Sequence, residues 1–344
     1  MRLLLLFFLF AAGCQNPALT SAKLYLQDED LTRAKQQLEK ALAESPNDPE
    51  VHFLIGRISA RQGAYATMDS AFSSSLSLSS HFAEEIEQMR RQYWAREYNT
   101  GVGLATSGAP NYRAALHAFG NAVVIDPVPL EPWHSIARLY HHLDSLATAV
   151  EIYNHILFSI PTDTTSLAGL GAIYLEQQRY IEAVDPLSLL VEFATEDVNA
   201  HINLGIAYEH TERYSEAETR YLEAIELDPR NGLAHYNLGN LRWNRAEYAT
   251  AADAYRRVLV LSPEDDDARY NLAVTYVHLG DLDKALPLLQ TLSQRMPDNA
   301  AIWRQLGRIY AAKGMKGDSR RALERAEAAS LKEKAEAASI EEGR

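Results

Sequence analysis

The sequence offers few candidate nucleophiles, metal ligands or phosphate-binding loops, and their spacing matches no known catalytic motif. The 344 residues include one cysteine, Cys14, so neither an internal disulfide nor a thiolate zinc cluster can form. The segment GVGLATSG (101–108) follows no predicted strand, and the sequence has no HExxH, GxSxG or P-loop motif. His134 and His141 share a helical face, a spacing more typical of surface histidines than of a metal site. We expect no catalytic residues, no metal and no cofactor.

The charge of the chain restricts its partners. Forty-six acidic residues outnumber 33 basic ones, which gives a formal net charge of −13. An acidic surface repels phosphate, so nucleic acid is not an expected partner. The apolar fraction of 47% is sufficient for a packed interior.

Cys14 follows a segment with the features of a secretory signal. Arg2 precedes LLLLFFLFAA, an apolar run too short for a membrane span, which needs about 20 residues. The stretch Ala11-Ala12-Gly13-Cys14 resembles the lipobox of bacterial lipoproteins. The resemblance implies removal of residues 1–13 and lipidation of Cys14, whose acyl chains would insert into a bilayer. The alternatives are a conventional signal peptide with an incidental cysteine, which would give a secreted soluble protein, or a misassigned start.

The residue after the cysteine, Gln15, indicates to which of the two bacterial membranes the protein would be sorted. By analogy with lipoprotein sorting in enteric bacteria, the absence of Asp after the cysteine favours the outer membrane over the inner one. We therefore expect a lipid-anchored protein of the bacterial cell envelope, on the periplasmic face of the outer membrane.

The remaining sequence repeats with a period of 34 residues. INLGIAYEHTERYSEAETRYLEAIELDP (202–229) is followed one period later by YNLGNLRWNRAEYATAADAYRRVLVLSP (236–263). The same period predicts units at 15–48, 49–82, 96–129, 130–163, 164–197, 198–231, 232–265, 266–299 and 300–333. Apolar residues three and four apart give each unit two amphipathic helices.

The repeated pattern resembles the tetratricopeptide repeat. Its first half, W-x2-L-G-x2-Y, is matched by Trp303, Leu306, Gly307 and Tyr310, and its second half by Ala217, Tyr221, Ala224 and Pro229. The eighth position, where the two helices of a repeat cross closely in that family, is always small: Ala22, Gly56, Gly103, Ala137, Gly171, Gly205, Gly239, Ala273 and Gly307. The resemblance implies an all-α, right-handed superhelical solenoid of about nine helix-turn-helix repeats.

Two segments depart from the period. Residues 83–95 are extra, and Phe82, Ile86, Met89 and Tyr93 give them an apolar helical stripe, so we expect an extension of the next repeat's first helix. This extension would either brace the second repeat or dock a partner. Residues 334–344 are rich in Ala, Glu and Lys, as expected for the polar cap of a solenoid.

The resemblance also implies a binding surface. In the family, the first helix of each repeat lines a concave face. The inward positions here are His134, Arg138, His141, His142, Glu176, Asn203, Glu209, His210, Tyr236, Asn237, Asn240, Trp243, Asn244, Tyr270, Asn271, His278, Arg304 and Arg308. Tyr, Trp, Arg and Asn are typical of recognition surfaces. Asn203, Asn237 and Asn271 lie one repeat apart and resemble a ladder that binds a peptide backbone.

These observations favour a non-catalytic, membrane-anchored scaffold that binds proteins or extended peptides through the concave face. The alternative is an accessory module that presents glycan or peptide to an envelope enzyme.

Overall fold

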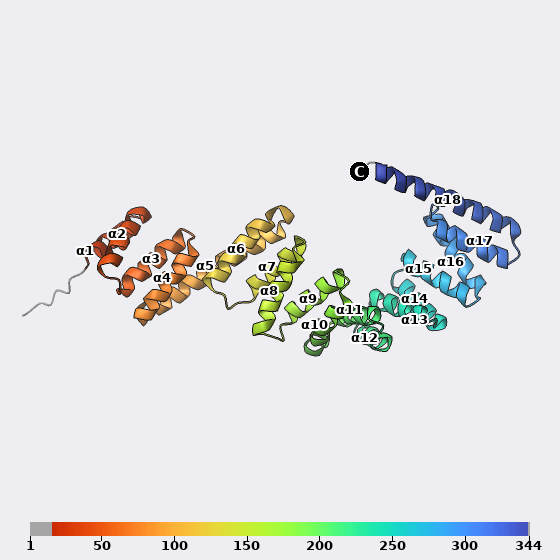
Figure 1. Cartoon of the computed structure of the whole chain (residues 1–344), viewed down its shortest axis with the longest axis horizontal. Coiled ribbons are helices and arrows are strands. Elements are labelled where there is room, and N and C mark those ends of the chain that lie inside the picture. The colour runs from red at the N-terminus through yellow and green to blue at the C-terminus, as the bar shows by residue number, and fades with distance from the viewer. Residues whose placement is uncertain (1–15, 343–344) are drawn as a thin grey trace, which may run out of the picture. The chain divides into compact units, whose positions relative to one another are not determined.

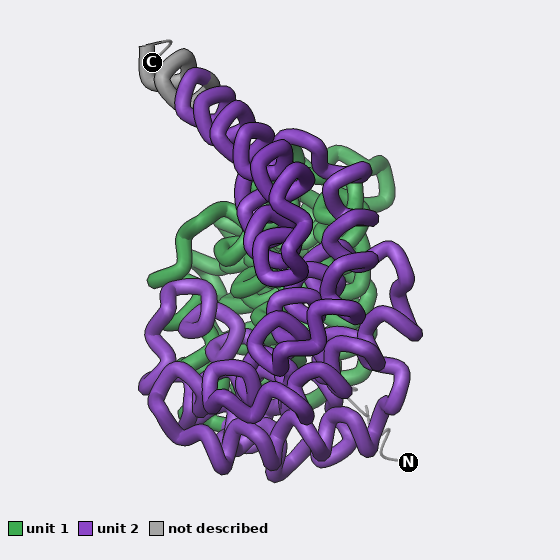
Figure 2. Tube along the Cα trace, turned by 90° about the vertical axis from the view of Figure 1, so that its right-hand side faces the viewer, with its two compact units in different colours: residues 1–159 green, residues 160–344 purple. Residues whose placement is uncertain are grey.

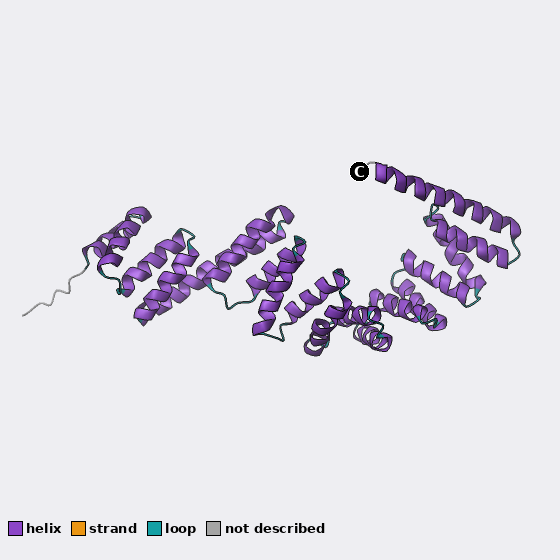
Figure 3. Cartoon of the chain, in the orientation of Figure 1, coloured by secondary structure: helices purple, strands orange, loops and turns teal. Residues whose placement is uncertain are grey.

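The computed structural model describes residues 16–342, which are almost entirely helical (Figure 3). No strand occurs in this range. Within the described residues, eighteen α-helices alternate with short turns and pair along the chain, so the predicted all-α fold of nine helix pairs is confirmed. Cys14 and the leader at 1–13 lie outside the described residues.

Each pair consists of a first and a second helix, labelled in Figure 1. The first helices are α1 (Pro17–Gln27), α3 (Pro49–Arg61), α5 (Ala83–Thr106), α7 (Glu131–His142), α9 (Thr164–Glu176), α11 (Val198–His210), α13 (Gly232–Asn244), α15 (Asp266–His278) and α17 (Ala300–Ala312). The second helices are α2 (Leu31–Glu44), α4 (Tyr65–Leu78), α6 (Tyr112–Ile125), α8 (Leu146–Ser159), α10 (Tyr180–Phe193), α12 (Tyr214–Leu227), α14 (Tyr248–Leu261), α16 (Leu282–Arg295) and α18 (Lys316–Glu342). Short 3₁₀ turns at Ser80–Phe82 and Ala109–Asn111 precede α5 and α6.

The chain divides into two compact units, one ending at Ser159 and one starting at Ile160 (Figure 2). The first unit contains the pairs from α1 to α8, and the second those from α9 to α18.

The helix boundaries follow from local chemistry. Seven first helices begin after an Asp or Asn whose side chain accepts backbone N–H groups of the first turn: Asn16, Asp48, Asp163, Asp197, Asn231, Asp265 and Asn299. Each turn within a pair contains one residue with positive φ: Glu29, Gly63, Gly108, Asp144, Gln178, Glu212, Ala246, Gly280 or Gly314. This left-handed residue reverses the chain into the second helix.

A large side chain of the second helix covers the small eighth position of the first. A Cβ placed on Gly239 would lie 2.8 Å from the ring of Tyr255, and one on Gly205 would lie 2.5 Å from that of Tyr221. Such distances are below van der Waals contact, so only glycine fits there without a shift of the neighbour. Where the eighth position is alanine, as at Ala137, it is completely buried.

The third pair differs from the predicted register. Gly103 was expected to occupy the eighth position, but it is exposed and a Cβ there would meet nothing within 4 Å. Gly101 takes that place instead, and a Cβ added to it would lie 2.7 Å from the ring of Phe119. The predicted register also puts Pro110 at the left-handed position, where proline cannot adopt positive φ; Gly108 occupies it. The first helix is therefore displaced by two residues, and the following turn, 107–111, is correspondingly longer than 211–213.

The extra residues form the N-terminal half of α5 and pack on the first two pairs. Ile86 is 1% exposed within their core, and Met89 and Tyr93 are partly buried against it. The ring of Phe82, just before α5, stacks on that of Phe53 at 4.3 Å. Arg90 pairs with Asp69 of α4. Of the two expected roles, these contacts match the brace.

A polar network fixes the rest of α5. The Tyr65 hydroxyl donates to Glu97 Oε1 at 2.8 Å, and Asn121 Nδ2 donates to Glu97 Oε2 at 2.9 Å. Burial and the neighbouring carboxylate raise the pKa of Tyr65 to about 12, so it remains a donor. One carboxylate thus links α4, α5 and α6.

Six junctions between successive helix pairs of the described chain share a hydrogen bond that was not predicted from the sequence. A side-chain N–H of the first helix donates to the carbonyl two residues beyond the preceding second helix. The donors are His52, Trp133, His201, His235, Arg269 and Trp303, and each acceptor lies six residues earlier. The acceptor carbonyl lies beyond the end of the helix, so no intrahelical N–H donates to it, and the side chain provides the missing donor.

Candidate functional site

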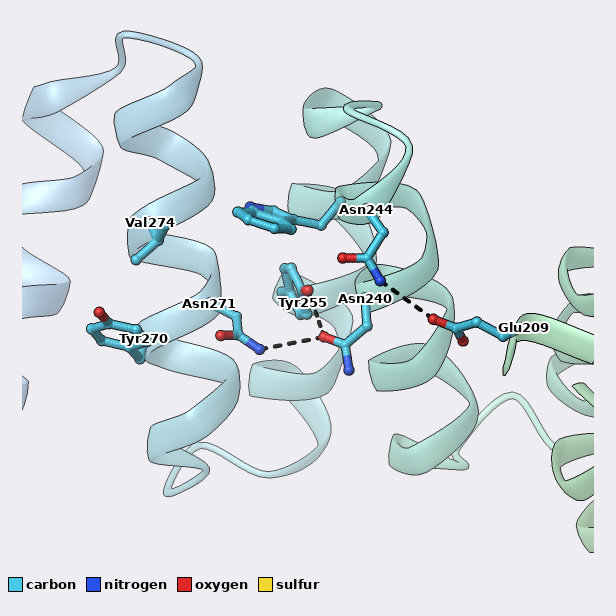
Figure 4. Close-up of a pocket in the computed structure, with 8 residues that line it drawn as sticks. Glu209, Asn240, Asn244, Tyr255, Tyr270, Asn271 and Val274 are labelled. Atoms are coloured by element: carbon cyan, nitrogen blue, oxygen red, sulfur yellow. Dashed lines mark hydrogen bonds between the residues drawn. The ribbon is translucent and has the colours of Figure 1, made fainter. Parts of the chain in front are cut away.

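A pocket of about 370 Å³ lies on the first helices α11, α13 and α15 of the second unit (Figure 4). Its walls are polar side chains and aromatic rings: Glu209, Asn240, Trp243, Asn244, Tyr255, Tyr270, Asn271 and Val274. All but Tyr255 come from first helices, which repeat the same side-chain directions every 34 residues. Tyr255 reaches the pocket from α14.

Asn240 is the centre of a hydrogen-bond network in the pocket. Its Oδ1 accepts the Tyr255 hydroxyl at 2.7 Å and Asn271 Nδ2 at 3.4 Å. Asn271 Nδ2 also lies 3.0 Å from the hydroxyl oxygen of Tyr236. Burial, together with the charge of Glu209 and the nearby Tyr236, raises the pKa of Tyr255, so this hydroxyl stays protonated. The network holds Asn240 and Asn271 in fixed orientations.

Glu209 supplies the charge of the pocket. Its Oε2 accepts the Tyr221 hydroxyl at 3.0 Å, and its Oε1 accepts Asn244 Nδ2 at 3.4 Å. Burial, and then the Glu209 charge, raise the pKa of Tyr221, which keeps Tyr221 a donor. Two neutral donors therefore orient the carboxylate without neutralising it.

Trp243 forms the aromatic wall with two further rings. Its ring centroid lies 5.7 Å from that of His278 and 6.1 Å from that of Tyr248, both in edge-to-face geometry. Tyr248 and His278 stack at 4.8 Å. Mutual contact limits the rotamers of these rings, so the wall is formed before any ligand binds.

Several residues predicted from the repeat positions come together here. Asn240, Trp243, Tyr270 and Asn271 line the pocket, and Tyr236 joins it through Asn271. Tyr255 is not among the inward positions predicted from the sequence, because it lies on the second helix α14. Its hydroxyl makes it part of the site. A tyrosine rather than a phenylalanine at a buried position could have indicated from the sequence that this hydroxyl forms a hydrogen bond.

Other predicted residues of the second unit do not line this pocket. Arg304 and Arg308 are exposed on α17. Asn237 Nδ2 is buried and has no hydrogen-bond partner among the described residues, whereas the Asn271 amide is bonded within the protein. Together with the partly buried Asn203, the three asparagines therefore do not present one uniform row of amides.

His134, Arg138 and His141 belong to α7 of the first unit. Arg138 and His142 line a separate cleft of about 380 Å³ there, with Tyr98 and Tyr112 among its other walls. The rings of His141 and His142 are 6.2 Å apart. Among the described residues, no three His, Cys, Asp or Glu side chains are grouped to hold a metal ion.

Sequence models of the tetratricopeptide repeat match residues 19–67, 202–268, 236–294 and 280–341, more than half of the chain. The chain belongs to the tetratricopeptide repeat family. A search of curated proteins finds no match.

Solved structures share this tetratricopeptide fold. A tetratricopeptide repeat protein from Parabacteroides merdae is 17% identical over 69% of this chain and 93% of its own, with a TM-score of 0.52. PilF from Pseudomonas aeruginosa is 19% identical over 60% and 94%, also with a TM-score of 0.52. YrrB, described as having an unusual peptide-binding site, is 24% identical over 53% and 94%, with a TM-score of 0.48. The tetratricopeptide fold itself indicates a protein-interaction scaffold rather than a catalyst.

Proposed function

We propose that this tetratricopeptide protein is a membrane-anchored scaffold of the bacterial envelope that binds an extended segment of a partner protein. The observation that carries the proposal is the pocket on α11, α13 and α15. It combines a preformed aromatic wall at Trp243 with fixed amides at Asn240 and Asn271, as a peptide-recognition surface requires.

The anchor is proposed from the sequence around Cys14. Each buried methylene of an acyl chain contributes about 0.8 kcal/mol, so several chains on one cysteine would hold the protein stably at a bilayer. Helix α1 begins at Pro17 and is capped by Asn16. The first helix pair would thus start within a few residues of the lipid, on the periplasmic face of the outer membrane. No helix among residues 16–342 is long and apolar enough to cross a membrane.

The pocket can be tested by removing its aromatic surface. We expect Tyr236→Ala combined with Trp243→Ala to reduce capture of the natural partner in cells, measured by crosslinking and mass spectrometry. Tyr214→Ala is the matched control, because Tyr214 is 41% exposed on α12 and does not line the pocket. The variants must retain the wild-type helical circular dichroism. Unchanged capture by the double variant would place binding elsewhere.

A further inference from the structure

The pocket has a single charged group, and that group has no counterion. Glu209 is the only ionisable acid or base among the lining residues apart from the tyrosines. Within the described chain it accepts hydrogen bonds only from Tyr221 and Asn244, and it forms no ion pair. A partly buried carboxylate with two neutral donors still has accepting capacity and an uncompensated charge.

Arginines near the pocket in sequence are already paired elsewhere. Arg213, four residues after Glu209, lies 3.0 Å from Glu216. Arg242 and Arg245 on and after α13 bind Glu218 at 3.1 and 2.8 Å. Arg245 also lies 2.9 Å from Glu247. These arginines are therefore engaged with other carboxylates, which leaves the Glu209 charge available to a ligand.

The other lining groups also suit a cation. Asn244 donates its amide N–H to Glu209, and Figure 4 shows its oxygen pointing away from Glu209, toward the side of α15. Trp243 and Tyr270 contribute aromatic rings to the lining, and the face of such a ring attracts a guanidinium or an ammonium group.

We propose that this pocket binds a lysine or arginine side chain of the peptide segment, with the cation paired to Glu209. The inference rests on the proposed function, because the cation is carried by the bound segment. An acidic side chain would meet the Glu209 charge, and an apolar one would cover the carboxylate without pairing it, at a cost in desolvation. The volume of about 370 Å³ accommodates one long side chain. The net charge of −13 would also attract a basic segment.

Pools of random peptides with one fixed central residue test the proposal. Each peptide is about eight residues long, enough to cross neighbouring first helices in extended form. The fixed residue is Lys, Arg, Leu or Glu, and binding to the full chain is measured by fluorescence anisotropy. We expect the Lys and Arg pools to bind about ten-fold more tightly than the Leu pool, and the Glu pool to bind most weakly. This preference should shrink as salt is added.

Two substitutions separate charge from shape. Glu209→Gln keeps the size and an acceptor for Tyr221 but carries no charge. We expect it to abolish the preference for Lys and Arg, and to bind the Leu pool more tightly than the wild type does, because no charged carboxylate is then covered without a partner. Tyr221→Phe removes a hydrogen bond to Glu209 but not its charge, and should retain the preference. Helical circular dichroism is recorded for both variants.

The outcomes distinguish this inference from the proposed function. Equal binding of all four pools by the wild type, or a Lys and Arg preference that survives Glu209→Gln, would overturn the cation site while leaving peptide binding intact. Absence of binding to every pool would contradict both.

Discussion

At the scale of single residues, the glycines at the close crossing of a helix pair are explained by the large side chains that cover them. In α5, Gly101 lies against Phe119, whereas Gly103, two residues away, has open space around its Cα. An added Cβ would therefore clash at Gly101 but not at Gly103, although both residues lie on the same helix.

We expect Gly101→Ala to destabilise the protein by about 1–3 kcal/mol, because the added Cβ would overlap the Phe119 ring. Gly103→Ala should instead stabilise it by about 0.5–1 kcal/mol, since alanine restricts the unfolded chain and adds no clash. Urea unfolding of both variants measures the difference. Equal effects of the two substitutions would contradict the assignment of Gly101, rather than Gly103, to the position packed against Phe119.

His235 is a residue whose charge state depends on its junction. Its Nε2–H donates to the Pro229 carbonyl at 3.2 Å. Burial lowers the pKa of His235 below the usual 6.5, and the neighbouring Arg257 acts in the same direction. The folded protein therefore holds this ring neutral, while the unfolded chain takes up a proton more readily.

The stability that neutral His235 contributes is present above about pH 6.5 and is lost as the pH falls toward the lower folded-state pKa. His235→Trp keeps an N–H donor, as Trp133 and Trp303 do at equivalent junctions, and does not titrate. We expect the free energy of unfolding to fall less for this variant than for the wild type between about pH 7 and about pH 5. Parallel pH profiles would contradict this assignment.

At the scale of elements, the N-terminal half of α5 completes the core of the first two pairs. Its apolar stripe was evident in the sequence, but a stripe alone does not distinguish a brace from a docking helix. The burial of Ile86 between α5 and those pairs makes the difference.

We expect Ile86→Ala to cost about 2–5 kcal/mol and to increase hydrogen exchange in α3 and α4, because it leaves a cavity beneath α5. Glu87→Ala is the control on the exposed side of the same helix, where the Glu87 side chain is 68% exposed. Its effect should stay within about 0.5 kcal/mol. If the two changes were equivalent, α5 would not support the first two pairs.

At the scale of the whole molecule, the proposed membrane anchor depends on one atom, the Cys14 thiol. We expect an alkyne-labelled fatty acid to label the wild-type protein in bacterial cells and not Cys14→Ala. The variant should move from the membrane fraction to the soluble fraction, because the acyl chains are lost. Fatty-acid label on Cys14→Ala would exclude this lipidation site.

The sequence alone predicted the fold, because each repeat is built from local preferences that recur every 34 residues. Caps such as Asp197, apolar spacing and the small eighth position all act within one helix pair or its neighbour. The repeat pattern also predicted that Asn240, Trp243, Tyr270 and Asn271 face inward from the first helices, and these residues line the pocket.

Only the tertiary structure decided which groups meet. The register shift at Gly101 depends on how α5 packs on Phe119, and an insertion can be divided between a helix and a turn without changing the period. The Tyr255 hydroxyl, the orientation of Asn271 and the unpaired charge of Glu209 depend on distances between side chains from different helices. Periodicity specifies which positions of a helix face inward; contacts across helices determine which of those side chains remain available to a ligand.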